Sequence, residues 1–162
     1  MRWTLKPKPV TDKVDALQKA LQVDSAIATM LVQRGIETYE EAKTFFRPRL
    51  EDLHDPFLMK DMDKAVARID KASANKECIL VYGDYDVDGT TSVALMSSYL
   101  KTKHNLVYTY IPNRYDEGYG ISYKGINFAL ENGFSLIIAL DCGIKAIEKV
   151  AYAKKTGIDF II

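Results

Sequence analysis

Apolar residues follow a helical period in the first part of the chain. They recur every three or four positions at Val14, Leu17, Leu21, Ile27, Met30 and Leu31. Asp24 stands where it can cap the second of these helices, and Gly35 where it can end that helix in the left-handed conformation. The pattern predicts two short helices joined by a tight turn.

Two further helices are expected before residue 77. Thr38-Tyr39-Glu40-Glu41 has the form of a capping box and opens a short helix through Phe46, which Pro48 stops. Asp61 is expected to cap a helix that ends near Asn75. Paired short helices also occur in DNA-reading helix-turn-helix motifs, but this segment has no basic recognition face. We therefore favour a small helical layer packed on the main domain.

From residue 77 onward the apolar pattern changes to short continuous runs. The expected strands cover residues 78–82, 106–111, 134–140 and 159–162, and the expected helices cover residues 90–100, 123–132 and 145–155. Strands that alternate with helices and are apolar on both faces are typical of a parallel sheet covered on both sides. The predicted fold class is therefore α/β, a parallel β-sheet with helices on both faces, preceded by a small N-terminal helical region. The expected domains are residues 1–76 and 77–162.

The composition limits the class of protein without identifying it. Of the 162 residues, 48% are hydrophobic and 27% are charged, as in globular proteins, and no apolar run approaches the ~20 residues of a membrane span. Cys78 and Cys142 are too few for a disulfide framework, and the N-terminus has no apolar signal core, so a reduced cytoplasmic setting is expected. Basic and acidic residues balance at 22 each, which argues against a globally basic nucleic-acid binder but not against a local binding groove.

Acidic residues gather directly after the predicted strands. Asp84, Asp86 and Asp88 alternate after the first strand, and Asp141 follows the third. Since ligands bind outside the carboxyl ends of parallel strands, all four are expected to meet at one edge of the sheet. Clustered carboxylates repel one another, so they must take up protons or bind cations, and hard oxygen ligands favour Mg²⁺ or Mn²⁺. Two ions about 4 Å apart would suit the hydrolysis of phosphoesters.

The acidic string has other interpretations. A lone aspartate there would be a turn residue or a helix cap, and a cap is a strong competitor for Asp141. An EF-hand loop is excluded because it needs a bidentate Glu where Leu95 stands. Asp86-Val87-Asp88-Gly89-Thr90 also matches the nucleophile motif of haloacid-dehalogenase-like phosphatases, with Asp86 as the nucleophile. That motif follows its strand directly, whereas Gly83-Asp84-Tyr85 intervenes here, so this remains the second choice.

A loop after the second strand carries residues suited to nucleic acid. Arg114 can pair with a phosphate through two hydrogen bonds, and Tyr115 and Tyr119 can stack on unpaired bases for ~1–3 kcal/mol per base. The alternative is a glycine-containing loop whose tyrosines pack against the sheet. Arg114, Tyr115 and Tyr119 are thus the candidate substrate-binding residues.

Several separated motifs together resemble the DHH phosphoesterase family, in the form of its RecJ-type single-stranded-DNA exonucleases. The first covers residues 81–91, and the others are Asn113-Arg114-Tyr115-Asp116-Glu117-Gly118-Tyr119-Gly120 and Leu140-Asp141-Cys142-Gly143. Arg34-Gly35-Ile36 and residues 53–59 are similar to the lead-in of that branch. The resemblance covers nearly the whole chain, although the Asp-His-His sequence that names the family is absent.

The resemblance implies a function and a ligand set. Asp84, Asp86, Asp88 and Asp141 would belong to a site for two Mn²⁺ or Mg²⁺ ions, with Asp84 either a ligand or a group that orients water. The implied activity is hydrolysis of single-stranded DNA from the 5′ end, in DNA repair and recombination, with a helicase and a single-strand-binding protein as partners. The alternatives are family members that cut short oligonucleotides, cyclic dinucleotides or pyrophosphate, and a non-catalytic nucleic-acid- or nucleotide-binding module.

The last predicted strand is expected to continue. Ile162 lies inside an apolar run, and a parallel strand needs the loop and helix that follow it. We therefore expect an N-terminal fragment, whose phosphoesterase domain begins at residue 77 and reaches an Asp-His-His sequence within roughly five residues of Ile162. By itself the fragment is expected to be inactive as an exonuclease.

Overall fold

A computed structural model describes residues 2–162. The chain divides between Leu58 and Met59 into two compact units, and each is described by itself. No helix in the described part is both long enough and apolar enough to cross a membrane.

The first unit holds three short helices with a small core of their own. Helices α1 (Thr11–Leu21), α2 (Ser25–Val32) and α3 (Tyr39–Phe46) lie where the sequence predicts them, and two 3₁₀ turns follow, Leu50–Asp52 and Pro56–Leu58. The buried residues are Val14, Leu17, Ala28, Leu31 and Val32. Asp24 caps α2 by accepting a hydrogen bond from the Ala26 amide at 2.8 Å, and the capping box of Thr38 and Glu41 opens α3.

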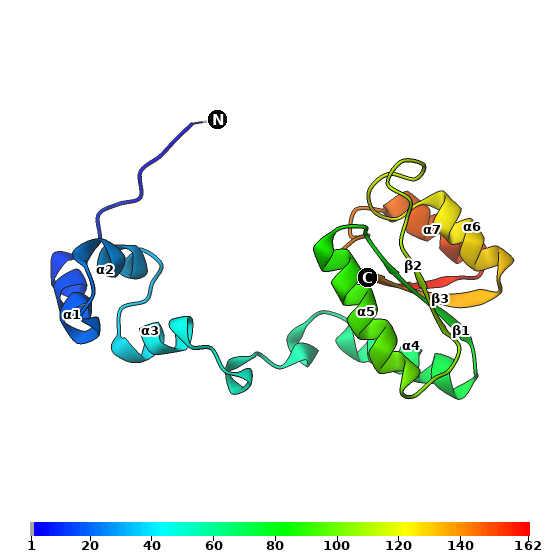
Figure 1. The fold of residues 1–162 in the computed structure, drawn as a ribbon, viewed down its shortest axis with the longest axis horizontal. Coiled ribbons are helices and arrows are strands. Elements are labelled where there is room, and N and C mark those ends of the chain that lie inside the picture. The colour runs from blue at the N-terminus through cyan, green and yellow to red at the C-terminus, as the bar shows by residue number, and fades with distance from the viewer. Residues whose placement is uncertain (1) are drawn as a thin grey trace. The chain divides into compact units, whose positions relative to one another are not determined.

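The second unit is a parallel sheet with helices on both faces, which confirms the predicted fold class. Its elements are α4 (Met62–Ala74), β1 (Cys78–Gly83), α5 (Val87–Lys101), β2 (Val107–Tyr110), α6 (Tyr123–Glu131), β3 (Phe134–Leu140), α7 (Ile147–Lys155) and β4 (Asp159–Ile161). The strand order is β2-β1-β3-β4, so the strand that precedes the acidic string is central. In Figure 1, α6 and α7 lie together on one side of the strands and α5 lies on the other.

Alternate residues of each central strand point to opposite faces, and each face has its own core. On one face the strands pack against α6 and α7 through Leu80, Tyr82, Ile137, Ala139, Ile126, Ala129 and Ala153. On the other face they pack against α4 and α5 through Ile79, Val81, Leu136, Ile138, Ala72, Val93 and Leu100. The sheet is therefore buried on both sides, as its continuous apolar strands predict.

The observed boundaries differ from the predicted ones at three places: the start of α5, the cap of α4 and the start of the sheet unit. Helix α5 begins at Val87 instead of residue 90, because Asp86 caps it. Asp61 precedes α4 but does not cap it: its backbone is left-handed and its carboxylate pairs with Lys64. Helix α4 belongs to the sheet unit, so that unit starts before the expected boundary at residue 77.

Candidate metal centre

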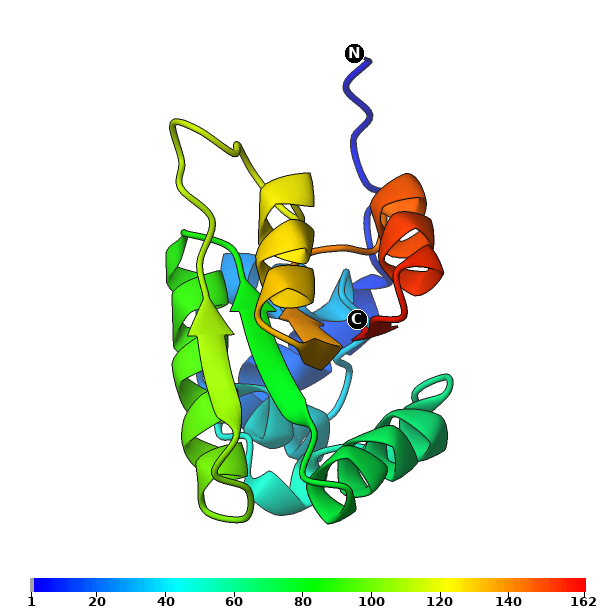
Figure 2. The ribbon, with the colours of Figure 1, turned by 90° about the vertical axis from the view of Figure 1, so that its right-hand side faces the viewer.

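The carboxyl ends of the parallel strands bring together segments that are far apart in the sequence. Asp84, Asp86 and Asp88 follow β1, Asp141 follows β3, and residues 113–120 follow β2. We call the first four the carboxylate edge and the last segment the tyrosine loop. In Figure 2 the arrowheads of β1 and β2 point the same way, and the loop after β2 extends beyond them.

Asp86 starts helix α5 with a complete cap. Its Oδ1 accepts the Gly89 amide at 2.8 Å, and its Oδ2 accepts the Tyr119 hydroxyl at 2.8 Å. The first of these bonds, and then the second, lower the pKa of the Asp86 carboxyl below its ordinary value. Asp88 lies in the first turn of the same helix and is exposed, where the helix dipole favours a negative charge.

A glycine allows this helix to start close to the strand. A Cβ at Gly89 would lie 2.4 Å from the Asp84 carbonyl oxygen and 2.6 Å from its amide nitrogen. Backbone atoms cannot move aside as a flexible side chain can, so only glycine fits at this point. The Asp88-Gly89 pair therefore combines a charged residue with a close approach of helix and strand.

Asp84 is held differently from the other three aspartates. It is fully buried (0% exposed), and its oxygens accept the Tyr85 amide at 2.8 Å and the Gly120 amide at 2.7 Å. A buried carboxylate needs such donors because it has lost its water. Asp84 thus joins the end of β1 to the tyrosine loop.

Asp141 has a left-handed backbone directly after β3, with φ of +56°. It does not cap the next helix, since α7 begins after Ala146, so the capping explanation is wrong for this residue. Its side chain is exposed, and no hydrogen bond or ion pair engages it within residues 2–162. An aspartate tolerates this conformation better than most residues, but it still stores local strain of the kind found at functional sites.

The negative charge of the carboxylate edge contributes to the raised pKa values of two neutral groups, Cys142 and Tyr119. Burial raises the pKa of the Cys142 thiol to about 11, with further contributions from Asp84, Asp141 and Asp86. The bond to Asp86 raises the pKa of the Tyr119 hydroxyl to about 12, and the charges of Asp84 and Asp141 add to it. A thiol with so high a pKa is unreactive, so Cys142 serves as a packing residue.

The four carboxylates share an edge, but they do not form a ready-made metal cage. Among residues 2–162, no three His, Cys, Asp or Glu side chains converge closely enough to hold an ion. The prediction that all four meet therefore needs correction, because hydrogen bonds hold Asp84 and Asp86 back against the protein. The donor set still fits a hard divalent cation: in the described part of the chain the oxygens of Asp88 and Asp141 are free of protein partners, and those of Asp86 keep unused lone pairs.

The tyrosine loop lies against the carboxylate edge. The Tyr119 ring contacts the Tyr85 ring edge-on with centroids 5.5 Å apart, and the Arg114 guanidinium lies 4.5 Å from the centre of the Tyr85 ring. Tyr115 is 93% exposed and Tyr119 is 62% exposed, so packing against the sheet does not explain either. Arg114 and Tyr119 thus flank the aspartates, whereas Tyr115 faces solvent.

Two further side chains at this edge, Tyr85 and Glu117, make contacts that the sequence pattern does not predict. Tyr85 sits inside the acidic string, and its contact with Arg114 depends on a loop almost thirty positions away. Glu117 accepts hydrogen bonds from the Tyr110 hydroxyl, the Asn113 amide and the Ser122 hydroxyl. In the sequence, Glu117 is marked only by its place within the motif of residues 113–120.

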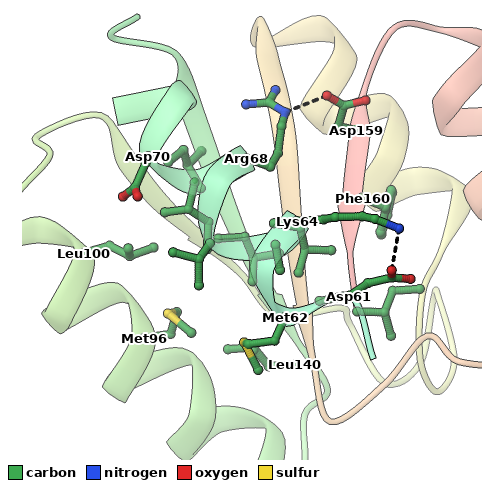
Figure 3. Close-up of a pocket in the computed structure, with 18 of the residues that line it drawn as sticks. Asp61, Met62, Lys64, Arg68, Asp70, Met96, Leu100, Leu140, Asp159 and Phe160 are labelled. Atoms are coloured by element: carbon green, nitrogen blue, oxygen red, sulfur yellow. Dashed lines mark hydrogen bonds and ion pairs between the residues drawn. The ribbon is translucent and has the colours of Figure 1, made fainter. Parts of the chain in front are cut away.

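One apolar pocket of about 900 Å³ lies elsewhere in the sheet unit. Figure 3 shows residues of α4, α5, β3 and β4 around it, among them Arg68, Met96, Leu100 and Phe160. None of the four aspartates lines it. The pocket therefore does not belong to the candidate metal centre.

Comparisons with known proteins agree with this arrangement. The family described as "DHH family, N-terminal domain" matches residues 78–162. The single-stranded-DNA-specific exonuclease RecJ of Bacillus subtilis (strain 168) is 42% identical over the whole chain, and the chain spans about a fifth (20%) of its length.

Solved structures show the same fold. A crystal structure of exonuclease RecJ bound to manganese is 30% identical, with a TM-score of 0.58 over 63% of this chain and 26% of that one. The structure of RecJ from Thermus thermophilus in complex with Mn²⁺ has a TM-score of 0.69 at 24% identity, and it covers 98% of this chain and 22% of the other.

Proposed function

Because the chain belongs to the DHH family, we propose that it forms the first part of a metal-dependent phosphodiesterase that hydrolyses single-stranded DNA from the 5′ end. The chain is similar to proteins that are single-stranded-DNA-specific exonucleases, over about a fifth of their length. The activity proposed is therefore that of a whole protein, to whose site these residues would contribute one part.

One observation carries this proposal: the carboxylate edge is stabilised by neutral donors alone. Amides and a tyrosine hydroxyl bind Asp84 and Asp86, and no lysine or arginine within residues 2–162 pairs with any of the four aspartates. Neutral donors orient carboxylates but leave their negative charge in place. A divalent cation would compensate that charge.

The four aspartates have different roles in the proposed site. Asp88, Asp141 and Asp86 would hold Mn²⁺ or Mg²⁺, since their oxygens have room for another partner. Asp84 would support the site by holding the end of β1 and the tyrosine loop together, because it is buried and each of its oxygens accepts a hydrogen bond from a backbone amide. When bound, two such ions would ionise a water molecule and neutralise the phosphoryl oxygens.

The tyrosine loop would hold the nucleic acid next to these carboxylates. Arg114 can reach a phosphate, and the exposed rings of Tyr115 and Tyr119 can stack on unpaired bases, whatever their sequence. Tyr85 would keep Arg114 in place through the cation–π contact. Stacking of this kind requires single strands, in agreement with the proposed substrate.

The phosphatase alternative is less well supported. In that motif the nucleophilic aspartate directly follows its strand, whereas β1 ends at Gly83, and Asp84 and Tyr85 separate Asp86 from it. A cytoplasmic setting, a role in DNA repair and recombination, and partners such as a helicase and a single-strand-binding protein belong to the same proposal.

The metal requirement is the first test. We expect millimolar Mn²⁺ to raise the melting temperature of the 162-residue chain by about 4 °C, since a ligand that binds only the folded state stabilises it. Asp88→Asn and Asp141→Asn should each remove most of this gain, while the control Asp116→Asn, an exposed aspartate of the tyrosine loop, should keep it. In the longer protein, the same two variants should lose the release of mononucleotides from single-stranded DNA. Absence of any Mn²⁺ effect on the unmodified chain would contradict the proposed site.

A further inference from the structure

Glu117 lies within the tyrosine loop and connects it to neighbouring elements by accepting several hydrogen bonds. Its two oxygens lie 3.0 and 2.9 Å from the Tyr110 hydroxyl oxygen at the end of β2, and Oε1 accepts the Asn113 amide at 2.8 Å. Oε2 also accepts the hydroxyl of Ser122, which caps α6 through the Gly125 amide. Glu117 therefore joins three segments: the end of β2, the start of the loop and the start of α6.

The far end of the same loop reaches the carboxylate edge. The Gly120 amide donates to Asp84, and the Gly120 carbonyl accepts the Tyr82 hydroxyl of β1 at 2.9 Å. The Tyr119 hydroxyl donates to Asp86. Both donors that the loop gives to the aspartates thus lie within three residues of Glu117.

Glu117 itself has no capacity left for a ligand. Burial raises the pKa of its carboxyl, but the bonds from Asn113, Ser122 and Tyr110 outweigh this and lower it. It is therefore an ionised group whose lone pairs already face donors of the protein. Its charge serves the loop and not a cation.

We propose that Glu117 is a positioning residue, which pins the tyrosine loop so that Gly120 and Tyr119 orient Asp84 and Asp86 for metal binding. This rests on the proposed function, because it assumes that the carboxylate edge binds a divalent cation. Groups that hydrogen-bond to metal-binding carboxylates commonly affect metal affinity by about 10–100-fold when they are removed. Glu117 does not bond to the aspartates itself. It acts through the loop whose Tyr119 and Gly120 donate to them.

The test measures Mn²⁺ affinity by calorimetry on the 162-residue chain. Glu117→Ala should weaken Mn²⁺ binding about tenfold. Glu117→Gln should restore much of the affinity, since an amide oxygen can still accept the Asn113 amide. The matched control is Asp116→Ala, which removes a charge of the same sign from an exposed neighbour in the same loop and should leave affinity unchanged.

A second measurement reports on the loop without metal. In Glu117→Ala, hydrogen exchange of the Gly120 amide should become faster, whereas amides of the central strand β1 should keep their protection. If Glu117→Ala does not fold, Tyr110→Phe removes one donor of the same network and should give a smaller loss of affinity in the same direction.

The outcomes separate the two proposals. If the unmodified chain binds no Mn²⁺, the proposed metal site fails, and the positioning role fails with it. If the unmodified chain binds Mn²⁺ and every variant that folds binds it as tightly as Asp116→Ala does, only the role of Glu117 is refuted.

Discussion

Two groups of acidic residues lie at opposite ends of the same sheet, and the protein neutralises only one of them. At the amino ends of the strands, Arg68 of α4 pairs with Glu77 at 2.7 Å and with Asp159 at 2.6 Å, and Ser135 also donates to Glu77. We call these four residues the arginine network. At the carboxylate edge, amides and a tyrosine hydroxyl are the donors, and no basic side chain pairs with the aspartates within residues 2–162.

The difference separates a cluster whose charges the protein neutralises itself from the one that we propose to bind a cation. In the arginine network, Arg68 pairs with the two carboxylates, so their charge is compensated within the chain. The same bonds connect α4 to the starts of β1 and β4. Arg68 keeps one buried nitrogen, Nη1, without a partner in the described structure, which shows that the network is not perfectly matched. The carboxylate edge leaves its charge open although lysines and arginines are as common as acids in the sequence. An uncompensated cluster of this kind costs stability, and a bound cation would remove that cost.

The largest expected effect comes from removing the arginine. Arg68→Met keeps an apolar stem but leaves Glu77 and Asp159 without their cation. Hydrogen bonds to charged groups contribute about 1.5–3 kcal/mol each. The variant should therefore have a free energy of unfolding that is lower by about 2 kcal/mol. Asp88→Asn changes the charge at the other edge and should cost nothing in the absence of metal. Urea unfolding in EDTA measures both. Equal losses in the two variants would remove the distinction between the clusters.

Acid should act on the arginine network through Glu77. The Ser135 hydroxyl, and next Arg68, lower the pKa of the Glu77 carboxyl from 4.5 to about 2. A lowered pKa gives stability that is complete above pH 4.5 and is lost as the pH falls towards 2. Glu77→Gln should therefore be less stable than the unmodified chain at about pH 7, and the gap should close between pH 4.5 and 2. A gap of constant size in urea unfolding across that range would show that ionisation of Glu77 does not contribute.

The smallest expected effect is a gain at the carboxylate edge. Asp141→Gly removes the strain of the left-handed backbone and one negative charge. The flexibility of glycine in the unfolded chain offsets part of this gain. Without metal, the variant should therefore be more stable by about 0.5 kcal/mol. Lys76→Gly is the control, since Lys76 has a similar φ of +57° and lies outside the edge. Both variants should gain stability in EDTA, but only Asp141→Gly should lose the stabilisation by Mn²⁺. A loss of stability in EDTA for Asp141→Gly would mean that the aspartate supports the fold itself.

Much of the fold could be predicted from the sequence because the signals are local. The cap at Asp24, the capping box at Thr38 and the strand at residues 134–140 depend on neighbours within a few positions, so a short stretch of sequence contains the whole interaction. The placement of Asp84 and Asp141 at one edge follows from the alternation of strands and helices, since parallel strands end on the same side. The sequence alone determined these features.

Only the tertiary structure decided which acidic residues are compensated. Arg68 meets Asp159 across 91 positions, and the Gly120 amide meets Asp84 across 36, so neither contact has a sequence signal of its own. The same is true of the close approach at Gly89 and of the network around Glu117. Such contacts form because packing the helices on the sheet places distant groups together, where each buried carboxylate must find a donor. The sequence alone therefore determined where the carboxylates gather, and the packing determined which of them remain open to a cation.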